Sequence, residues 1–242
     1  MAEVDPADVQ NHRVVAHEEW VAARKEFLKK EKAFTKQRDA LSRERRALPW
    51  ERVGKPYSFE GPRGKATLAD LFGKRSQLLV YHFMFSPDAD AGCPHCSFWA
   101  DNFDGIDVHL RQRDVSFVAV SRAPLAKIEA FRKRMGWRFD WWSSAPSDFN
   151  FDYGVSFEES QLDDGTAIYN YDKVESDSPD REGISAFYKD KKGGLFHTYS
   201  CYSRGIDMVN GAYHFLDLAP KGRDEEKLEF TQAWVKHHDR YE

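Results

Sequence analysis

Two cysteines separated by two residues form the motif with the clearest chemical meaning in this sequence. Cys93 and Cys96 belong to the string Gly92-Cys-Pro-His-Cys, which follows an apolar run and precedes a helical pattern. Residues three positions apart lie on the same edge of a helix, so the two sulfurs can meet and close a disulfide. One thiolate can attack an external disulfide, and the other thiol can then resolve the mixed disulfide. The spacing therefore predicts thiol–disulfide exchange.

The residues around Cys93 favour its thiolate form. A helix N-terminus presents free N–H groups and the positive end of the helix dipole, and both lower the pKa of a thiol placed there. Pro94 suits the first helical position, where no amide hydrogen is needed, and His95 adds positive charge when it is protonated. We therefore expect Cys93 to be the exposed nucleophile, Cys96 the resolving thiol, and His95 a catalytic residue that stabilises the thiolate.

A metal site is the alternative interpretation of the same cysteines. His197 and Cys201 form an H-x3-C pair that, with Cys93 and Cys96, completes the Cys3His ligand set of structural zinc sites. The two pairs are far apart in the sequence, so only the fold could bring them together. His82, within an apolar strand, is more typical of a hydrogen-bonded core histidine. Under this hypothesis the protein binds zinc or copper.

The segments around the dithiol predict an α/β domain. The apolar runs Leu78–Phe85 and Val115–Val120 are typical of strands buried on both faces of a parallel sheet. Between them, a helical pattern with a break at Gly105 runs from Pro94 to about Arg113, and a further helix is expected over Leu125–Met135. The order strand, helix, strand, helix implies right-handed crossovers. A C-x-x-C motif between strand and helix is typical of thioredoxin-type proteins.

The later part of the chain is less regular. Residues 148–182 are rich in acidic side chains and are expected to form an irregular insertion. The segments Ile184–Lys189 and Leu195–Tyr199 read as two strands, and the Gly-containing turn between them predicts a hairpin. The end of the chain, residues 224–242, is predicted to form a C-terminal helix.

A long charged helix is predicted ahead of this domain, within residues 1–48. The stretch His17–Ala47 contains no Gly or Pro, and Pro49 ends it. Apolar side chains recur every seven residues along it and form a narrow stripe, namely Trp20, Phe27, Phe34, Leu41 and Leu48. Such a helix is expected to lie on its own domain or on a second copy of the chain, which makes it a candidate homodimer contact.

Composition limits the classes of function. The chain has 242 residues, which suits one domain with appendages, and a net charge of -4, which argues against nucleic-acid binding through overall charge. Three cysteines are too few for a disulfide-stapled secreted scaffold. No apolar run approaches the ~20 residues that span a bilayer, and the first residues lack the pattern of an export signal. We therefore expect a cytoplasmic protein with no membrane contact.

Three longer strings resemble a single known family, the bacterial thioredoxin-like family called domain of unknown function 899. The strings are Gly92–Gly105, Phe196–Tyr213 and Asp217–Arg223. The resemblance implies a thioredoxin fold over residues 49–223, with a central mixed sheet flanked by helices and extensions at both ends. It also implies that Cys93 and Cys96 are the redox pair, but it supplies no substrate.

Taken together, the sequence predicts a thiol–disulfide oxidoreductase that needs no bound cofactor. Its partner is expected to be a protein or a low-molecular-weight thiol or disulfide. Peroxidase activity of the peroxiredoxin type is disfavoured, because the pattern P-x3-[ST]-x2-C requires Pro and Ser or Thr where this chain has Ser86 and Asp90.

Overall fold

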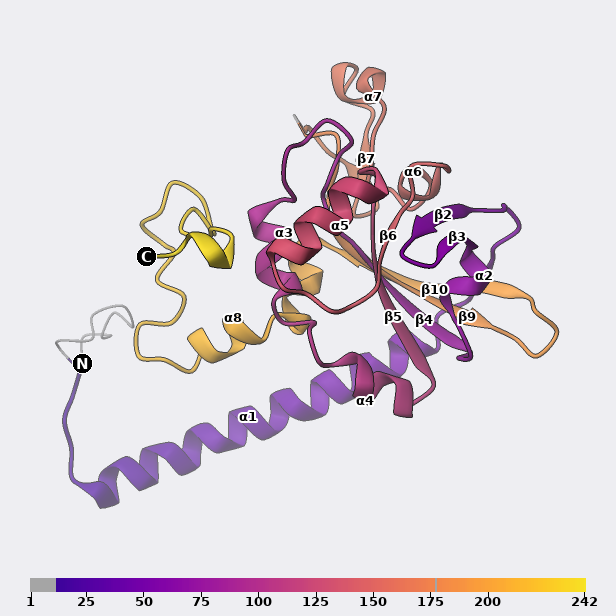
Figure 1. Cartoon of the computed structure of the whole chain (residues 1–242). Helices are drawn as coiled ribbons and strands as arrows, with labels where there is room; N and C mark the ends of the chain where they lie inside the picture. The colour runs from indigo at the N-terminus through magenta and orange to yellow at the C-terminus, as the bar shows by residue number, and fades with distance from the viewer. Residues whose placement is uncertain (1–11, 177) are drawn as a thin grey trace.

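Eight strands form one mixed sheet in the order β1-β10-β9-β4-β5-β6-β2-β3. The structure is a computed structural model that describes residues 12–176 and 178–242. The strands of this sheet are β1 (Glu51–Arg52), β2 (Ser58–Gly61), β3 (Gly64–Thr67), β4 (Gln77–His82), β5 (Val115–Ser121), β6 (Trp141–Ser143), β9 (Gly183–Lys189) and β10 (Leu195–Tyr202). The helices are α1 (His17–Arg46), α2 (Leu68–Leu71), α3 (Pro94–Ala100), α4 (Asp107–Gln112), α5 (Leu125–Arg134), α6 (Phe149–Asp152), α7 (Glu159–Asp163) and α8 (Gly211–Leu216). Figure 1 shows their arrangement.

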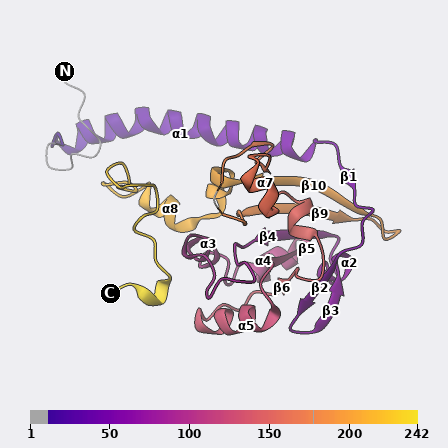
Figure 2. The ribbon, with the colours of Figure 1, turned by 90° about the horizontal axis from the view of Figure 1, so that it is seen from above.

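The centre of the sheet has the thioredoxin-like arrangement. Strands β4, β5 and β6 run parallel, β9 pairs antiparallel with β4, and β10 pairs antiparallel with β9. Helices α3 and α4 connect β4 to β5, and α5 connects β5 to β6. Figure 2 shows α5 and α1 on opposite sides of the molecule. The predicted fold class is therefore confirmed.

Burial explains why the apolar runs become central strands. Most of β4 and β5 is buried, as expected for strands covered on both faces. Successive residues of β6 serve opposite faces of the sheet, because Trp141 belongs to the aromatic cluster under α3 and Trp142 to the second cluster. The paired tryptophans thus fill the core. The predicted break at Gly105 is also confirmed, since its φ of 92° separates α3 from α4.

The acidic segment is an insertion with little regular structure, as predicted. It contains the short helices α6 and α7 and a separate two-stranded hairpin, β7 (Ile168–Tyr169) with β8 (Asp172–Lys173). The hairpin predicted after it is present as β9 and β10. Beyond β10 the chain forms a 3-10 helix, Ser203–Val209, and then α8.

The helix predicted at the C-terminus is wrong. Residues 224–242 form turns and a single short 3-10 helix, His238–Arg240. Asp224 and Gln232 have positive φ angles of 53° and 72°, which a continuous right-handed helix does not permit. Tertiary contacts decide this conformation, because the buried carboxylate of Glu225 accepts hydrogen bonds from the Gln232 N–H and the Trp234 side chain.

Helix α1 forms as predicted, but its apolar stripe does not pack on its own domain. None of its residues is buried, and Trp20, Phe27 and Phe34 are exposed to 56%, 56% and 64%. The helix runs along the outside of the molecule and extends beyond the sheet (Figure 1 and Figure 2). The expected contact of this stripe with its own domain is therefore wrong, and contact with a second copy stays a prediction. No helix within the described residues has the length and apolar character needed to span a membrane.

Candidate redox site

Cys93 lies at the junction between the central sheet and α3. It is the N-cap residue of α3, and Pro94 occupies the first turn. The Cys93 N–H donates to the carbonyl of Met84 at 3.1 Å, which ties the loop back to the end of β4. The Ser97 N–H and hydroxyl both donate to the Cys93 carbonyl, at 2.9 and 2.8 Å. The half-buried thiol is thus held at the helix start, as the sequence indicated.

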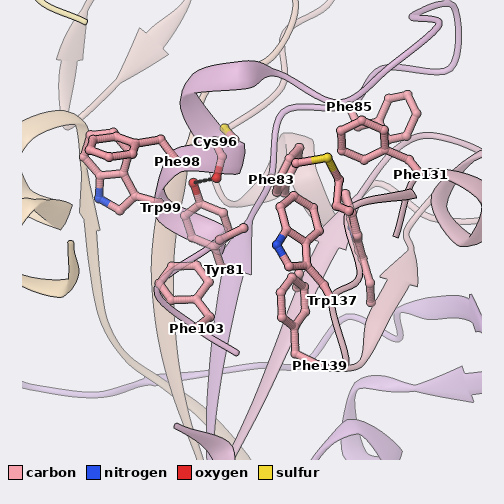
Figure 3. Packing of buried hydrophobic residues seen from close by; sticks show 14 of the residues in the cluster. Tyr81, Phe83, Phe85, Cys96, Phe98, Trp99, Phe103, Phe131, Trp137 and Phe139 are labelled. Atoms are coloured by element: carbon pink, nitrogen blue, oxygen red, sulfur yellow. Dashed lines mark hydrogen bonds between the residues drawn. The ribbon is translucent and has the colours of Figure 1, made fainter. Parts of the chain in front are cut away.

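Cys96 lies one turn deeper and is buried. Its sulfur accepts a hydrogen bond from the Met84 N–H at 3.4 Å, and its backbone carbonyl accepts one from the Tyr81 hydroxyl at 3.5 Å. Figure 3 shows Tyr81 reaching Cys96 from the strand below, within a cluster of aromatic side chains. Both cysteines are free thiols. The surrounding rings fix the inner cysteine, while the outer one borders a cavity.

Hydrogen bonds converge on the sulfur of Cys93. The Cys96 thiol, the His95 side chain and the Cys96 backbone N–H all stabilise the thiolate, and they lower the pKa of Cys93 well below its usual value despite the opposing effect of burial. The same contact with Cys93 raises the pKa of His95, and the Gln232 carbonyl and nearby Glu182 act in the same direction. The two shifts act together, since each favours the charged form of its own group.

The second thiol behaves in the opposite way. Burial, followed by the hydrogen bond and the negative charge of Cys93, raises the pKa of Cys96 well above its usual value. The two cysteines are thereby distinguished: the half-buried outer thiol ionises more readily than usual, and the buried inner thiol ionises less readily. Burial also raises the pKa of Tyr81, so its phenol stays protonated beside the pair.

A cavity of about 250 Å³ adjoins the dithiol. Its wall combines sulfur, aromatic and charged groups from five parts of the chain: Tyr81, Met84, Cys93, His95, Cys96, Trp99, Arg181, Glu182, Ser203, Arg204, Asp207, Thr231 and Gln232. No sequence motif pointed to Arg181, Glu182, Thr231 or Gln232. They reach the cavity only because the start of β9 and the end of the chain fold against α3.

The structure does not bring the proposed metal ligands together. His197 and Cys201 line a different cavity, of about 570 Å³, beside β10. His197 Nε2 lies 2.7 Å from the Ser200 hydroxyl, with which it is hydrogen-bonded. Within the described part of the chain, no group of three or more His, Cys, Asp or Glu side chains is placed to hold a metal ion. The described residues therefore do not assemble the alternative zinc or copper site of Cys93, Cys96, His197 and Cys201.

Gly92 provides space for close packing in the loop that leads into Cys93. A Cβ atom at this position would lie 2.7 Å from ring carbons of both Phe83 and Phe131. Because these rings belong to the packed aromatic core, we expect Gly92→Ala to destabilise the fold by about 1–3 kcal/mol. Urea denaturation measures the loss. Gly54→Ala is the control, since a Cβ atom there meets nothing within 4 Å, and equal stability of both variants would contradict the packing argument.

Comparison with known proteins assigns nearly the whole chain to one protein family. The model of a family described as "Bacterial protein of unknown function (DUF899)" matches residues 9–241. No curated protein matches the sequence. Peroxidoxin BcpB from Mycobacterium tuberculosis is 15% identical, with a TM-score of 0.45 over 67% of this chain and 93% of that one. Peroxiredoxin Q from Xanthomonas campestris is 14% identical, with a TM-score of 0.45 over 73% of this chain and 99% of that one.

Proposed function

Because the chain belongs to the bacterial family of unknown function DUF899, whose description carries no activity, we propose a function from the site itself. We propose that the protein is a thiol–disulfide oxidoreductase in which Cys93 is the nucleophile and Cys96 the resolving thiol. The observation that carries this proposal is the place of Cys93 at the N-cap of α3, with Cys96 buried one turn deeper. The lowered pKa of Cys93, caused by Cys96 and His95, agrees with it.

The reaction balances without a cofactor. The Cys93 thiolate attacks one sulfur of a substrate disulfide R–S–S–R, the S–S bond breaks, and the first half leaves as a thiolate that takes up a proton. Cys96 then loses its proton and attacks the Cys93 sulfur, which releases the second half as a thiol. Two electrons pass from the protein dithiol to the substrate, and a Cys93–Cys96 disulfide remains. The reverse sequence oxidises a dithiol substrate.

The opposite pKa shifts of the two cysteines suit this order of events. While Cys93 is a thiolate, its charge raises the pKa of Cys96 and keeps the inner thiol protonated. Once Cys93 is bound in the mixed disulfide, that charge is gone, and Cys96 can ionise more readily. His95, paired with Cys93 in the resting state, is placed to stabilise a thiolate whenever the Cys93 sulfur is the leaving group. Cys96 therefore becomes a better nucleophile only after Cys93 has bound the substrate.

Trapping the intermediate tests this proposal. We expect Cys96→Ser, treated with cystine, to accumulate a stable cysteine adduct on Cys93, because the resolving thiol is missing. The unmodified chain should instead form a Cys93–Cys96 disulfide with no lasting adduct. Intact-mass measurement and peptide mapping distinguish the two products.

Cys201→Ser is the matched control, since Cys201 is a buried thiol that lines the other cavity. It should form the Cys93–Cys96 disulfide like the unmodified chain. Failure of the unmodified chain to link Cys93 to Cys96 under oxidising conditions would refute the proposed function.

A further inference from the structure

The last part of the chain, residues 225–241, is anchored beside the dithiol. We call it the C-terminal cover. Arg134 of α5 donates to both carboxylate oxygens of Asp239, at 2.8 and 2.7 Å. His237 Nε2 lies 2.7 Å from the Gly92 carbonyl, directly before the nucleophile. His238 Nδ1 lies 2.7 Å from the carboxylate of Asp101 at the end of α3. These contacts secure the end of the cover to α5 and to both ends of α3.

A buried carboxylate organises the interior of the cover. Glu225, only 9% exposed, accepts hydrogen bonds from the Tyr213 hydroxyl at 3.0 Å, the Gln232 N–H at 3.1 Å and the Trp234 indole at 2.6 Å. The Trp234 ring also packs edge-on against Phe98 of α3, with centroids 5.3 Å apart. The cover therefore has a defined conformation although it lacks regular secondary structure.

The cover closes one side of the dithiol cavity. Thr231 and Gln232 contribute to the cavity wall, and the Phe230 ring lies 6.1 Å from the ring of His95. The yellow C-terminal segment lies beside α3 in both orientations (Figure 1 and Figure 2). A protein substrate needs a broad open surface around the reactive sulfur, since stable protein contacts bury roughly 800 Å² on each partner. Here Phe230, Thr231 and Gln232 occupy part of that surface.

The size and charge of the cavity indicate what fits beneath the cover. Its volume of about 250 Å³ lies below the ~300–1,000 Å³ of pockets that hold drug-sized molecules. Its lining includes residues of both charges, namely Arg181, Arg204, Glu182 and Asp207. Asp207 is ion-paired with Arg204 at 3.4 Å and with Arg223 at 3.1 Å, so a charged ligand would join an existing network of ion pairs. A ligand that carries both carboxylate and ammonium groups is complementary to such a wall.

We propose that the substrate of the dithiol is a disulfide of amino-acid size bearing carboxylate and ammonium groups, bound beneath the C-terminal cover, and that protein disulfides are excluded. This inference rests on the proposed function and specifies its substrate class. The electron balance is that of the exchange given above: two electrons and two protons pass from the reduced dithiol, and two small thiols are released.

Single-turnover kinetics test the proposal. The reduced full-length chain is mixed with cystine, with 2-hydroxyethyl disulfide or with insulin, and formation of the Cys93–Cys96 disulfide is followed. Each rate is divided by the rate of dithiothreitol with the same disulfide, which removes differences in intrinsic reactivity. We expect the corrected rate with cystine to exceed that with insulin by roughly a hundredfold or more, because association is slow when a covering segment must first open.

The three disulfides separate the possible failures. Equal corrected rates with cystine and insulin would overturn the exclusion of proteins. Equal corrected rates with cystine and the neutral 2-hydroxyethyl disulfide would overturn the charge assignment. A chain that forms no Cys93–Cys96 disulfide with any of the three would instead refute the proposed function.

Loosening the cover supplies an independent test. Glu225→Ala removes the acceptor that organises the cover, and Asp239→Ala removes its ion pair with Arg134 at the other end. We expect both variants to react faster with insulin, while their rate with cystine does not increase. The ratio of the corrected cystine rate to the corrected insulin rate should therefore fall at least fivefold. Glu229→Ala, at an exposed position of the same segment, is the control and should keep the ratio. If both variants fold and neither ratio falls, the cover does not exclude proteins.

Discussion

Replacing Cys93 by serine is expected to abolish disulfide exchange. The serine hydroxyl stays protonated at neutral pH, so the hydrogen bonds from Cys96 and His95 have no thiolate to stabilise. Removing the nucleophile that carries a reaction typically costs several orders of magnitude, and we expect the rate of cystine reduction to fall by at least about a thousandfold. The measurement is release of free thiol from cystine by the reduced protein.

Two comparisons make this prediction specific. Cys201→Ser should keep the exchange rate within about twofold. This thiol lines a separate cavity, and the proposed reaction does not use it. Circular dichroism and urea denaturation should show that Cys93→Ser remains folded. Retention of most of the activity in the Cys93→Ser protein would assign the chemistry to another residue.

Acid is expected to destabilise the protein strongly through His82. This histidine on β4 has no exposed surface, and its Nε2 lies 2.8 Å from the Ser185 hydroxyl. Its ring stacks near Phe149 and Tyr153. Burial, with a smaller contribution from His197, lowers the pKa of His82 from 6.5 to about 3.

The direction of the pH effect follows from this depressed value. Between pH 6.5 and about 3 the unfolded chain binds a proton at His82 that the folded chain does not bind, so the free energy of unfolding decreases as the pH falls. At ~1.4 kcal/mol per pH unit, the loss approaches roughly 5 kcal/mol near pH 3. Urea denaturation midpoints measured from pH 7 to pH 3.5 should record most of this loss.

The variant His82→Gln separates this histidine from other titrating groups. Glutamine retains a side-chain donor for Ser185 but does not titrate, so the variant should lose much of the pH dependence below 6.5. His109→Gln, on the exposed surface of α4, should keep it. A pH dependence that is identical in His82→Gln and the unmodified chain would contradict the prediction.

Local sequence features were sufficient to predict the position of the dithiol. Continuous apolar runs form buried strands because the side chains on both faces of the strand are apolar and are excluded from water. Pro94 after Cys93 marks a helix start, because proline lacks the N–H that is unpaired in the first turn of a helix. The order of these elements was enough to predict the parallel centre of the sheet, with Cys93 near the start of the first crossover. All of these are short-range effects that act within one or two turns or strands.

The surroundings of the site depended on contacts between distant segments. The C-terminal cover is not a helix, because the buried carboxylate of Glu225 and the contacts with α3 stabilise turns in place of local helical hydrogen bonds. Arg181 and Glu182 reach the cavity only because β9 pairs beside β4. Such contacts depend on which segments meet in space, and periodicity along the chain does not encode that.

The position of the His197 side chain also depends on long-range pairing that the local sequence does not reveal. In a regular strand, His197 and Ser200 would point to opposite faces, because side chains alternate. A β-bulge after His197 shifts the register of β10 against β9, and the two side chains meet at 2.7 Å. His197 thereby joins the hydroxyl chain that leads through Ser185 to His82, away from the cysteines at the start of α3. The sequence by itself determined which residues can perform redox chemistry and where their helix begins. Strand register and the packing of the chain end, which arise from long-range pairing and burial, decided which other groups surround them.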